Sequence, residues 1–204
     1  MIAPNLELPI GAIVCGVDEA GRGSLAGDVY AAAVVLPQSY DLPKLGDSKT
    51  LSASRRNALD KLIREQAVAF SVASASVEEI DALGITDATL LAMNRAIAAL
   101  QPRADFALID GNVTRGIELP CRAVVGGDAL VPAISAASIL AKVARDRYIT
   151  ELTAEYPGYG FERHKGYGTK LHYEMLAKLG ATPLHRTAFM KSDGGKWAMP
   201  NSTT

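Results

Sequence analysis

The stretch Ala12-Ile-Val-Cys-Gly-Val17, continued by Asp18-Glu19 and Gly21-Arg22-Gly23, sets the interpretation of the whole chain. Its apolar run is typical of a short buried strand, and the two glycines after it indicate a loop. We expect this strand to end at the acidic pair. A second apolar run over residues 29–36, stopped by Pro37, predicts a strand that forms a hairpin with the first.

Further along the chain, strand-like and helix-like segments indicate an α/β fold. Three more strands are expected over residues 68–75, 104–109 and 122–125, and helices over residues 51–66, 76–84, 86–100 and 132–154. Ser52 and Thr86 are residue types that cap helices, and Ser76-Val-Glu-Glu79 has the pattern of a capping box. The sequence therefore predicts a mixed five-stranded sheet flanked by helices.

Residues 155–204 have a different character. The segments 156–160 and 164–168 combine glycine with aromatic residues and are typical of loops, a helix is expected over residues 169–179, and the tail from Lys191 has the pattern of a frayed end. We therefore divide the chain into a domain over residues 1–154 and a small C-terminal helical segment over residues 155–204.

Length and composition favour one soluble globular unit. The 204 residues are 49% hydrophobic and 21% charged, enough for a real core. The longest apolar run, residues 30–37, is too short for a membrane span, and the N-terminus lacks a secretory signal pattern. Cys15 and Cys121 have no CxxC spacing and indicate neither a disulfide framework nor a metal site. We expect a cytoplasmic protein.

The charge is distributed unevenly along the chain. The formal net charge of −1 argues against a general nucleic-acid coating protein. Residues 1–130 hold 11 basic and 16 acidic side chains, whereas residues 131–204 hold 10 basic and 6 acidic ones. The C-terminal part is therefore the better candidate to face phosphate, although such an imbalance also arises on ordinary solvated surfaces.

Four carboxylates lie at the ends of apolar, strand-like segments with glycine nearby: Asp18, Glu19, Asp110 and Asp128. Separate strand ends can converge, and crowded carboxylates are most readily kept ionised by hard divalent cations such as Mg²⁺ or Mn²⁺. Two such ions can activate a water and stabilise the leaving oxygen of a phosphodiester. Each carboxylate taken alone also fits a turn or a helix cap. The set as a whole predicts a metal site for phosphodiester hydrolysis.

Other residues are candidates for contacts with nucleic acid. The glycines of Gly21-Arg22-Gly23 let backbone N–H groups approach a phosphate or a sugar, although a GxG sequence also fits a plain turn. On the helix over residues 132–154, hydroxyls and cations recur at spacings of three and four: Ser135, Ser138, Lys142 and Arg145. This stripe fits a nucleic-acid backbone or an ordinary charged face, and Lys49 has the same two interpretations.

The loop His164-Lys165-Gly166-Tyr167-Gly168 joins cations, glycines and an aromatic ring. Tyr167 can stack on a sugar or a base, or it can anchor a packed loop. The three histidines, His164, His172 and His185, lack zinc-ligand spacing with a cysteine. We assign them no metal and expect phosphate contacts or surface positions.

Six blocks of sequence together resemble the type 2 ribonucleases H, specifically bacterial ribonuclease HII, over about residues 12–189. The blocks are Gly16-Val-Asp-Glu-Ala-Gly-Arg-Gly-Ser-Leu-Ala-Gly27, Asp47-Ser-Lys49, Ile109-Asp-Gly-Asn112, Gly127-Asp128, Ser135-Ala-Ala-Ser-Ile-Leu-Ala-Lys-Val-Ala-Arg-Asp146 and His164-Lys-Gly-Tyr-Gly-Thr169. The resemblance implies an RNase H-like sheet with a small C-terminal helical segment that completes the substrate-binding face. It also implies two-metal-ion cleavage of the RNA strand of RNA/DNA hybrids and incision 5′ of ribonucleotides embedded in duplex DNA, with 5′-phosphate and 3′-hydroxyl products.

The resemblance also implies roles for individual residues. Asp18, Glu19, Asp110 and Asp128 match the metal-binding catalytic residues of the family. Gly21, Arg22 and Gly23 match the loop that reads the 2′-hydroxyl at the RNA–DNA junction, and Tyr167 matches a tyrosine that stacks on the following deoxyribose. The expected substrate-binding set is completed by Lys49, Ser138, Lys142, Arg145, His164 and Lys165. The expected cofactor is Mn²⁺ or Mg²⁺.

Two features of the sequence favour ribonuclease HII over the related ribonuclease HIII. Ribonuclease HIII usually has an extra N-terminal domain and a Lys in the glycine loop, whereas this chain has a short N-terminal lead and Arg22. Ala188 stands where the family pattern has Ser, and residues 191–204 contain no pattern of a sliding-clamp peptide. We expect a monomer that acts on RNA/DNA hybrids and on ribonucleotide-containing duplexes. The alternatives are a junction resolvase, which cuts all-DNA substrates, and a non-catalytic hybrid-binding module.

Overall fold

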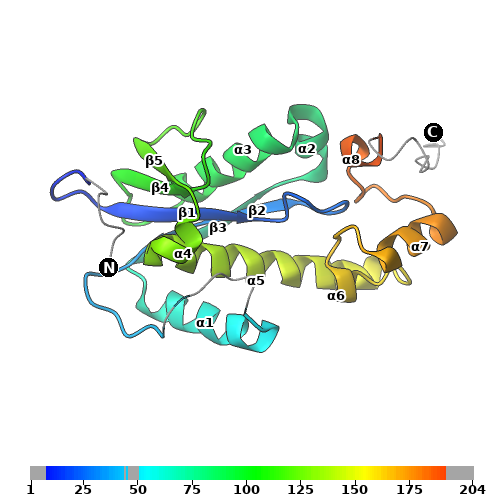
Figure 1. Ribbon diagram of the computed structural model, residues 1–204, viewed down its shortest axis with the longest axis horizontal. Helices are drawn as coiled ribbons and strands as arrows, with labels where there is room; N and C mark the ends of the chain where they lie inside the picture. The colour runs from blue at the N-terminus through cyan, green and yellow to red at the C-terminus, as the bar shows by residue number, and fades with distance from the viewer. Residues whose placement is uncertain (1–7, 44, 46–50, 192–204) are drawn as a thin grey trace.

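The computed structural model describes residues 8–43, 45 and 51–191. Its centre is one mixed sheet with the strand order β3-β2-β1-β4-β5 (Figure 1). β1 (Val14–Ala20), β2 (Val29–Val35) and β3 (Ala69–Ala75) are antiparallel neighbours, while β4 (Phe106–Asp110) and β5 (Cys121–Val124) run parallel to β1. The predicted five-stranded mixed sheet and the β1–β2 hairpin are confirmed.

β1 is longer than the sequence predicts. The strand does not end at the acidic pair, because Asp18 pairs with Ala32 and Glu19 with Ala31 across the hairpin. The small alanines let the ladder continue to Ala20, and the chain leaves the sheet only at Gly21, whose φ is +97°. Asp18 and Glu19 are therefore within β1, near its C-terminal end, and their side chains point to opposite faces of the sheet.

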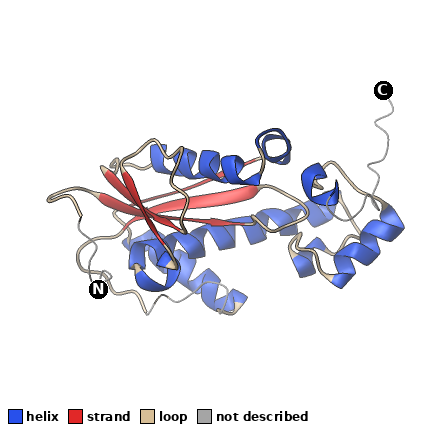
Figure 2. Ribbon diagram, turned by 45° about the horizontal axis from the view of Figure 1, so that its top comes forward, coloured by secondary structure: helices blue, strands red, loops and turns tan. Residues whose placement is uncertain are grey.

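Helices cover both faces of the sheet (Figure 2). α3 (Ile85–Ala98) packs with α2 (Val77–Leu83) on the face that contains Val17 and Ile109. α5 (Pro132–Glu155) lies on the other face, where it packs with α1 (Ala53–Gln66) against Ala32 and Val34. A Cβ on Gly16 would come 2.2 Å from the backbone of Ala133, so β1 and the start of α5 touch directly. No helix in the described ranges is both long and apolar enough to cross a membrane.

The helices begin at the capping residues predicted from the sequence, with one exception. Ser52 accepts a hydrogen bond from Arg55 N, and the predicted capping box at Ser76 is present in full. The prediction that Thr86 caps a helix is wrong, because α3 begins at Ile85 directly after Gly84, which ends α2. Gly84, at φ +80°, makes the turn between the two helices without a side-chain cap.

The C-terminal segment packs against the far end of α5, as Figure 1 shows. It contains α6 (Phe161–His164), α7 (Lys170–Leu179) and α8 (Thr187–Lys191). Only α7, capped by Thr169, was predicted; α6, α8 and α4 (Gly127–Leu130) are four- and five-residue helices too short to carry a periodic pattern. A cluster around Phe161, Leu176 and Ile149 joins the segment to α5. The division at residue 154 stays a prediction.

The two cysteines are separate, as expected. Cys15 and Cys121 both lie beside Ala107 of β4, on strands that flank it on either side. Two strand spacings separate their Cα atoms by about 9–10 Å, beyond the reach of a disulfide. Burial raises the pKa of the Cys15 thiol to about 12, so this side chain behaves as a small core residue.

Candidate active site

An open cleft of about 820 Å³ lies where β1 leaves the sheet. It is bounded by the glycine loop, by the middle of α5 and by the C-terminal segment. The predicted residues that line it are Asp18, Glu19, Gly21, Arg22, Gly23, Asp110, Ser138, Lys142 and Tyr167. Four separate parts of the sequence therefore meet in one cleft, although only Asp18 and Glu19 are close to the glycine loop in the chain.

Asp18 and Asp110 come together because of strand register. Val17 pairs with Ile109 in the parallel β1–β4 ladder, so the two carboxylates that follow occupy equivalent positions on neighbouring strands. Val17 and Ile109 face α3. Since side chains alternate along a strand, Asp18 and Asp110 both face α5. The register thus places two carboxylates at one edge of the sheet.

Asp18 is nearly buried, with 5% of its surface exposed. Burial raises the pKa of its carboxyl well above the usual value, and the charges of Glu19 and Asp110 raise it further, whereas a hydrogen bond from Ser138 lowers it. The backbone N–H of Glu19 donates to Asp18 Oδ1 at 2.7 Å. The charges of Glu19 and Asp110 therefore both act against a charge on Asp18.

Asp128 lies beside the cleft rather than in its lining. It is 9% exposed and belongs to the first turn of α4, after Gly126 at φ +65°. Its backbone N–H lies 3.3 Å from Asp110 Oδ1 and donates to it. The Ser135 hydroxyl donates to the Asp128 carbonyl, so α5 fixes the turn that carries the carboxylate.

These donors fit a hard divalent cation by their chemistry. They are carboxylate oxygens, the ligands that Mg²⁺ and Mn²⁺ prefer, and the repulsion on Asp18 is what a bound dication would relieve. Within the described ranges, no three His, Cys, Asp or Glu side chains are already arranged as a metal site. The fit therefore rests on donor type and on mutual repulsion.

The glycine loop presents backbone to the cleft. A Cβ on Gly21 would come 1.9 Å from Arg145 Nε, so only glycine fits there. At Gly23 a Cβ would meet nothing within 4 Å. Between them, the exposed Arg22 lies with Nη1 3.6 Å from Glu19 Oε1. Gly21 is therefore packed tightly against Arg145, whereas Gly23 has room for a side chain.

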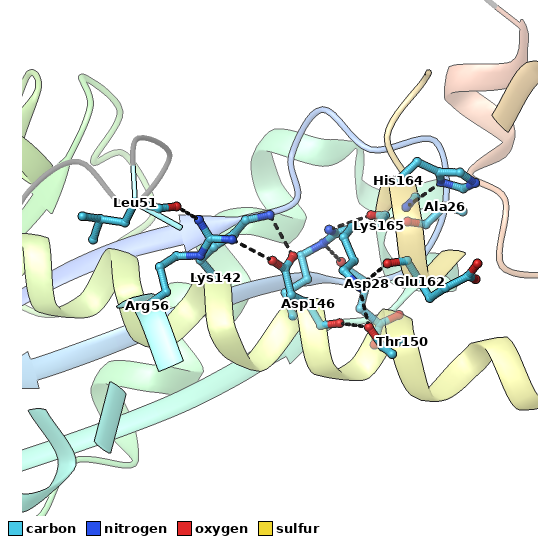
Figure 3. Close-up of polar contacts among 12 residues, drawn as sticks. Ala26, Asp28, Leu51, Arg56, Lys142, Asp146, Thr150, Glu162, His164 and Lys165 are labelled. Atoms are coloured by element: carbon cyan, nitrogen blue, oxygen red, sulfur yellow. Dashed lines mark hydrogen bonds and ion pairs between the residues drawn. The ribbon is translucent and has the colours of Figure 1, made fainter. Parts of the chain in front are cut away.

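Cations surround Asp146 on the α1 side of the cleft, as Figure 3 shows. Lys142 Nζ donates to Asp146 Oδ1 at 2.7 Å, and Arg56 Nη2 lies 3.6 Å from Asp146 Oδ2. The same Lys142 Nζ lies 5.1 Å from the ring centroid of Tyr167. Asp146 therefore orients two cations that line the cleft.

Two other predicted residues, Lys165 and Arg145, do not line this cleft. Lys165 Nζ donates to Thr150 Oγ1 and to the Glu162 carbonyl, both at 2.7 Å (Figure 3). The residue lines another groove, between α1 and α5. Arg145 is fully buried, so its expected place on an exposed stripe is wrong. Lys49 lies outside the described residues.

The expected phosphate or surface positions of the histidines are wrong. His172 and His185 are fully buried, and His164 is 7% exposed. The rings of His164 and His172 stack with centroids 4.2 Å apart, and both histidines bond to the backbone around Tyr167. Their role in this structure is to pack and hold the Tyr167 loop.

Four residues that line the cleft were not singled out from the sequence: Ala20, which follows the acidic pair, and Arg56, Ile85 and Phe189. Arg56 belongs to a helix whose pattern gives no reason to separate it from Arg55. Phe189 lies in the block His185-Arg-Thr-Ala-Phe189, which departs from the family pattern at Ala188. Nothing in the spacing of Arg56, Ile85 and Phe189 marks them, because α1, α3 and α8 reach the cleft only through tertiary packing.

Comparison with known proteins identifies the family of the chain. A family model described as Ribonuclease HII matches residues 15–192. The chain is 54% identical to the ribonuclease HII of Dechloromonas aromatica (strain RCB) over 186 residues, which are 91% of this chain and 94% of that protein.

Two solved structures are similar in fold. Ribonuclease H2 from Pyrococcus horikoshii OT3 has a TM-score of 0.74 and 26% identity, covering 86% of this chain and 92% of that one. Ribonuclease HII of Archaeoglobus fulgidus, solved in a complex with PCNA, has a TM-score of 0.72 and 26% identity, covering 94% and 98%. Because the family model and the relatives match along most of its length, the chain belongs to the ribonuclease HII family, and it is a ribonuclease H, a nuclease that hydrolyses nucleic acid.

Proposed function

We propose that this protein degrades the RNA strand of RNA/DNA hybrids and incises duplex DNA 5′ of embedded ribonucleotides. One observation carries the proposal: the carboxylates Asp18, Glu19 and Asp110 share a cleft with the glycine loop and Tyr167. Acidic residues suited to phosphodiester hydrolysis therefore lie next to groups suited to reading a sugar.

The four carboxylates Asp18, Glu19, Asp110 and Asp128 would hold Mg²⁺ or Mn²⁺. When bound, such ions supply an activated water and neutralise charge on the leaving oxygen, which gives 5′-phosphate and 3′-hydroxyl ends. Asp18 and Asp110 approach from neighbouring strands, while Glu19 comes from the opposite face of β1. Ser138 keeps the Asp18 carboxylate oriented through its hydrogen bond.

The remaining lining residues would bind and orient the nucleic acid. Lys142 offers an ammonium group to a phosphate. The backbone N–H groups of the glycine loop can approach a 2′-hydroxyl, which distinguishes RNA from DNA at one sugar. Tyr167, with Lys142 and Arg145 near its ring, provides a flat surface for the next sugar. Together these groups would select a ribonucleotide and align its 5′ phosphate with the carboxylates.

The test is cleavage of an end-labelled DNA duplex that holds one ribonucleotide, beside an all-DNA duplex and a long RNA/DNA hybrid. Each is incubated with Mg²⁺, with Mn²⁺ and with a chelator. We expect metal-dependent cutting 5′ of the ribonucleotide and within the hybrid RNA. Cutting of the all-DNA duplex would favour a resolvase, and metal-independent binding without cutting would favour a hybrid-binding module.

Localisation and assembly belong to the same proposal. We propose a cytoplasmic monomer without a sliding-clamp partner. The last point rests on residues 191–204, which contain no sliding-clamp pattern and which, after Lys191, lie outside the described residues. Size-exclusion chromatography with light scattering tests the monomer, and addition of the sliding clamp from the same source tests the partner.

A further inference from the structure

Two buried arginines from distant parts of the chain meet at the loop that joins β1 to β2. Arg145 comes from α5 and Arg186 from the segment before α8, and neither has any exposed surface. Arg145 donates to the carbonyls of Asp28, Ala26 and Lys165 at 3.0–3.2 Å. Arg186 donates twice to the Gly27 carbonyl, at 2.7 and 2.9 Å, and once to the Arg22 carbonyl at 2.9 Å. The two guanidinium groups thus hold the backbone of residues 22–28.

These arginines are costly to bury. In the part of the chain that the structure describes, neither forms an ion pair with a carboxylate within 4.0 Å. Burial and the neighbouring charge of Arg145 lower the pKa of Arg186 to about 9. A charge buried without a carboxylate partner costs free energy, which its hydrogen bonds to buried carbonyls must offset. Because the hydrogen bonds given above for both guanidinium groups go to backbone carbonyls, we infer that these side chains fix the local conformation of the backbone.

The same two guanidinium groups lie against aromatic rings of the cleft wall. The Arg145 guanidinium carbon is 5.2 Å from the ring centroid of Tyr167, and that of Arg186 is 5.4 Å from the ring centroid of Phe189. Both rings line the cleft that contains Asp18. Each arginine therefore connects one wall of the cleft to the glycine loop.

Backbone contacts hold the loop from both sides as well. Ser24 forms a β-bridge with Tyr167, and Ala26 forms one with His185. Arg145 also holds Lys165, whose φ of 52° is unusual for a residue with a side chain. The loop thus fits between two stretches of the C-terminal segment, and the arginines fill the space beneath it.

We propose that Arg145 and Arg186 are positioning residues for substrate recognition: they fix the glycine loop, Tyr167 and Phe189 in one arrangement without touching the nucleic acid. This inference rests on the proposed function and extends it to two residues outside the cleft. The carboxylates stand on β1, β4 and α4, and the hydrogen bonds given above for the two guanidinium groups go to none of these elements. Loss of an arginine should therefore weaken recognition of the ribonucleotide while sparing the chemical step.

The test compares Arg186→Met and Arg186→Lys with the wild type and with Arg103→Met, a matched change at an exposed position far from the cleft. Substrates are the duplex with one ribonucleotide and the all-DNA duplex. For Arg186→Met we expect KM to rise at least about tenfold with kcat within about threefold, and Arg186→Lys to recover part of the loss. Hydrogen exchange should quicken in residues 21–28 and not in β2 or β3.

The outcomes separate the two proposals. If the wild type and Arg103→Met fail to cut at the ribonucleotide, the proposed function fails. If both cut and Arg186→Met retains the wild-type KM, or loses kcat alone, the positioning role is overturned. Should Arg186→Met not fold, Arg145→Met provides the same comparison. Unfolding of both variants would also overturn the inference, because it would make the arginines part of the general fold.

Discussion

The Nε2 atoms of His172 and His185 lie 3.1 Å apart inside the C-terminal segment, so one ring donates a hydrogen bond to the other. The hydrogen bonds of the two Nδ1 atoms determine which ring is the donor and which is the acceptor. His172 Nδ1 lies 3.0 Å from the Tyr167 carbonyl and must carry a proton, which leaves its Nε2 as the acceptor. Thr182 N donates to His185 Nδ1, which leaves His185 Nε2 as the donor. The network requires both rings to be neutral.

Stability should therefore fall as the pH falls below neutrality. Burial lowers the pKa of His172 and of His185 from 6.5 to about 4. Between pH 6.5 and pH 4 the unfolded chain binds more protons than the folded one. The free energy of unfolding is therefore highest, as far as these histidines are concerned, above pH 6.5, and it decreases as the pH falls towards 4. Each histidine adds a slope of up to about 1.4 kcal/mol per pH unit. Urea unfolding of wild type and of His185→Gln at pH 5 and pH 7.5 gives the change in unfolding free energy between the two pH values. We expect a smaller change in His185→Gln, and an equal change in both proteins would contradict the prediction.

Asp18→Asn should remove activity and keep the fold. The amide has the same shape, and it relieves the repulsion from Glu19 and Asp110 as well as the cost of burying a charge. We expect the thermal midpoint in chelator to stay equal or rise. Turnover should fall at least about 1,000-fold, because several kcal/mol of charge stabilisation depend on this ligand. Asp87→Asn, an exposed Asp on α3, is the matched control. Near-normal turnover of Asp18→Asn would contradict the assignment.

The sheet, and the placing of Asp18, Glu19 and Asp110 in one cleft, were predictable because they depend on local signals. Apolar runs mark the strands, and the carboxylates follow them directly. The length of β1 was not predictable, since it depends on pairing with alanines of β2. The burial of Arg145 was missed because helical spacing cannot show that a loop from residues 22–28 covers one turn of α5. Phe189 reaches the cleft only through packing of the C-terminal segment.

Gly21→Ala and Gly23→Ala should differ in stability although they lie two residues apart. At Gly21, φ is +97° and a Cβ would collide with Arg145 Nε, whereas at Gly23 the Cβ would meet open space. We expect Gly21→Ala to cost about 2 kcal/mol or more of unfolding free energy, and Gly23→Ala about 0.5 kcal/mol or less. Urea titrations in chelator compare the two. Equal losses would contradict the packing of Arg145 against the loop.

Tyr167→Ala should weaken substrate binding more than Tyr167→Phe. The ring is the part that would stack on a sugar, and its neighbours Lys142 and Arg145 contact its π face rather than its hydroxyl. Loss of a stacking ring should raise Kd for the ribonucleotide duplex by about 10- to 100-fold, and loss of the hydroxyl alone by less than about threefold. Fluorescence anisotropy in chelator measures Kd without cleavage. A larger loss for Phe than for Ala would refute stacking.

Lys142→Gln should reduce the salt dependence of binding. Lys142 Nζ lies between Asp146 and the Tyr167 ring in the cleft wall, where a phosphate can replace or share the carboxylate partner. A cation that contacts one phosphate adds about −0.9 to the slope of log K against log salt concentration, because bound counterions are released. We expect the slope for the variant to be less steep by about that amount. Lys178→Gln, at an exposed position on α7, should keep the wild-type slope. If the two variants behave alike, Lys142 contacts no phosphate, which leaves Arg22 and Arg56 as the other cations of the cleft lining in the described part of the chain.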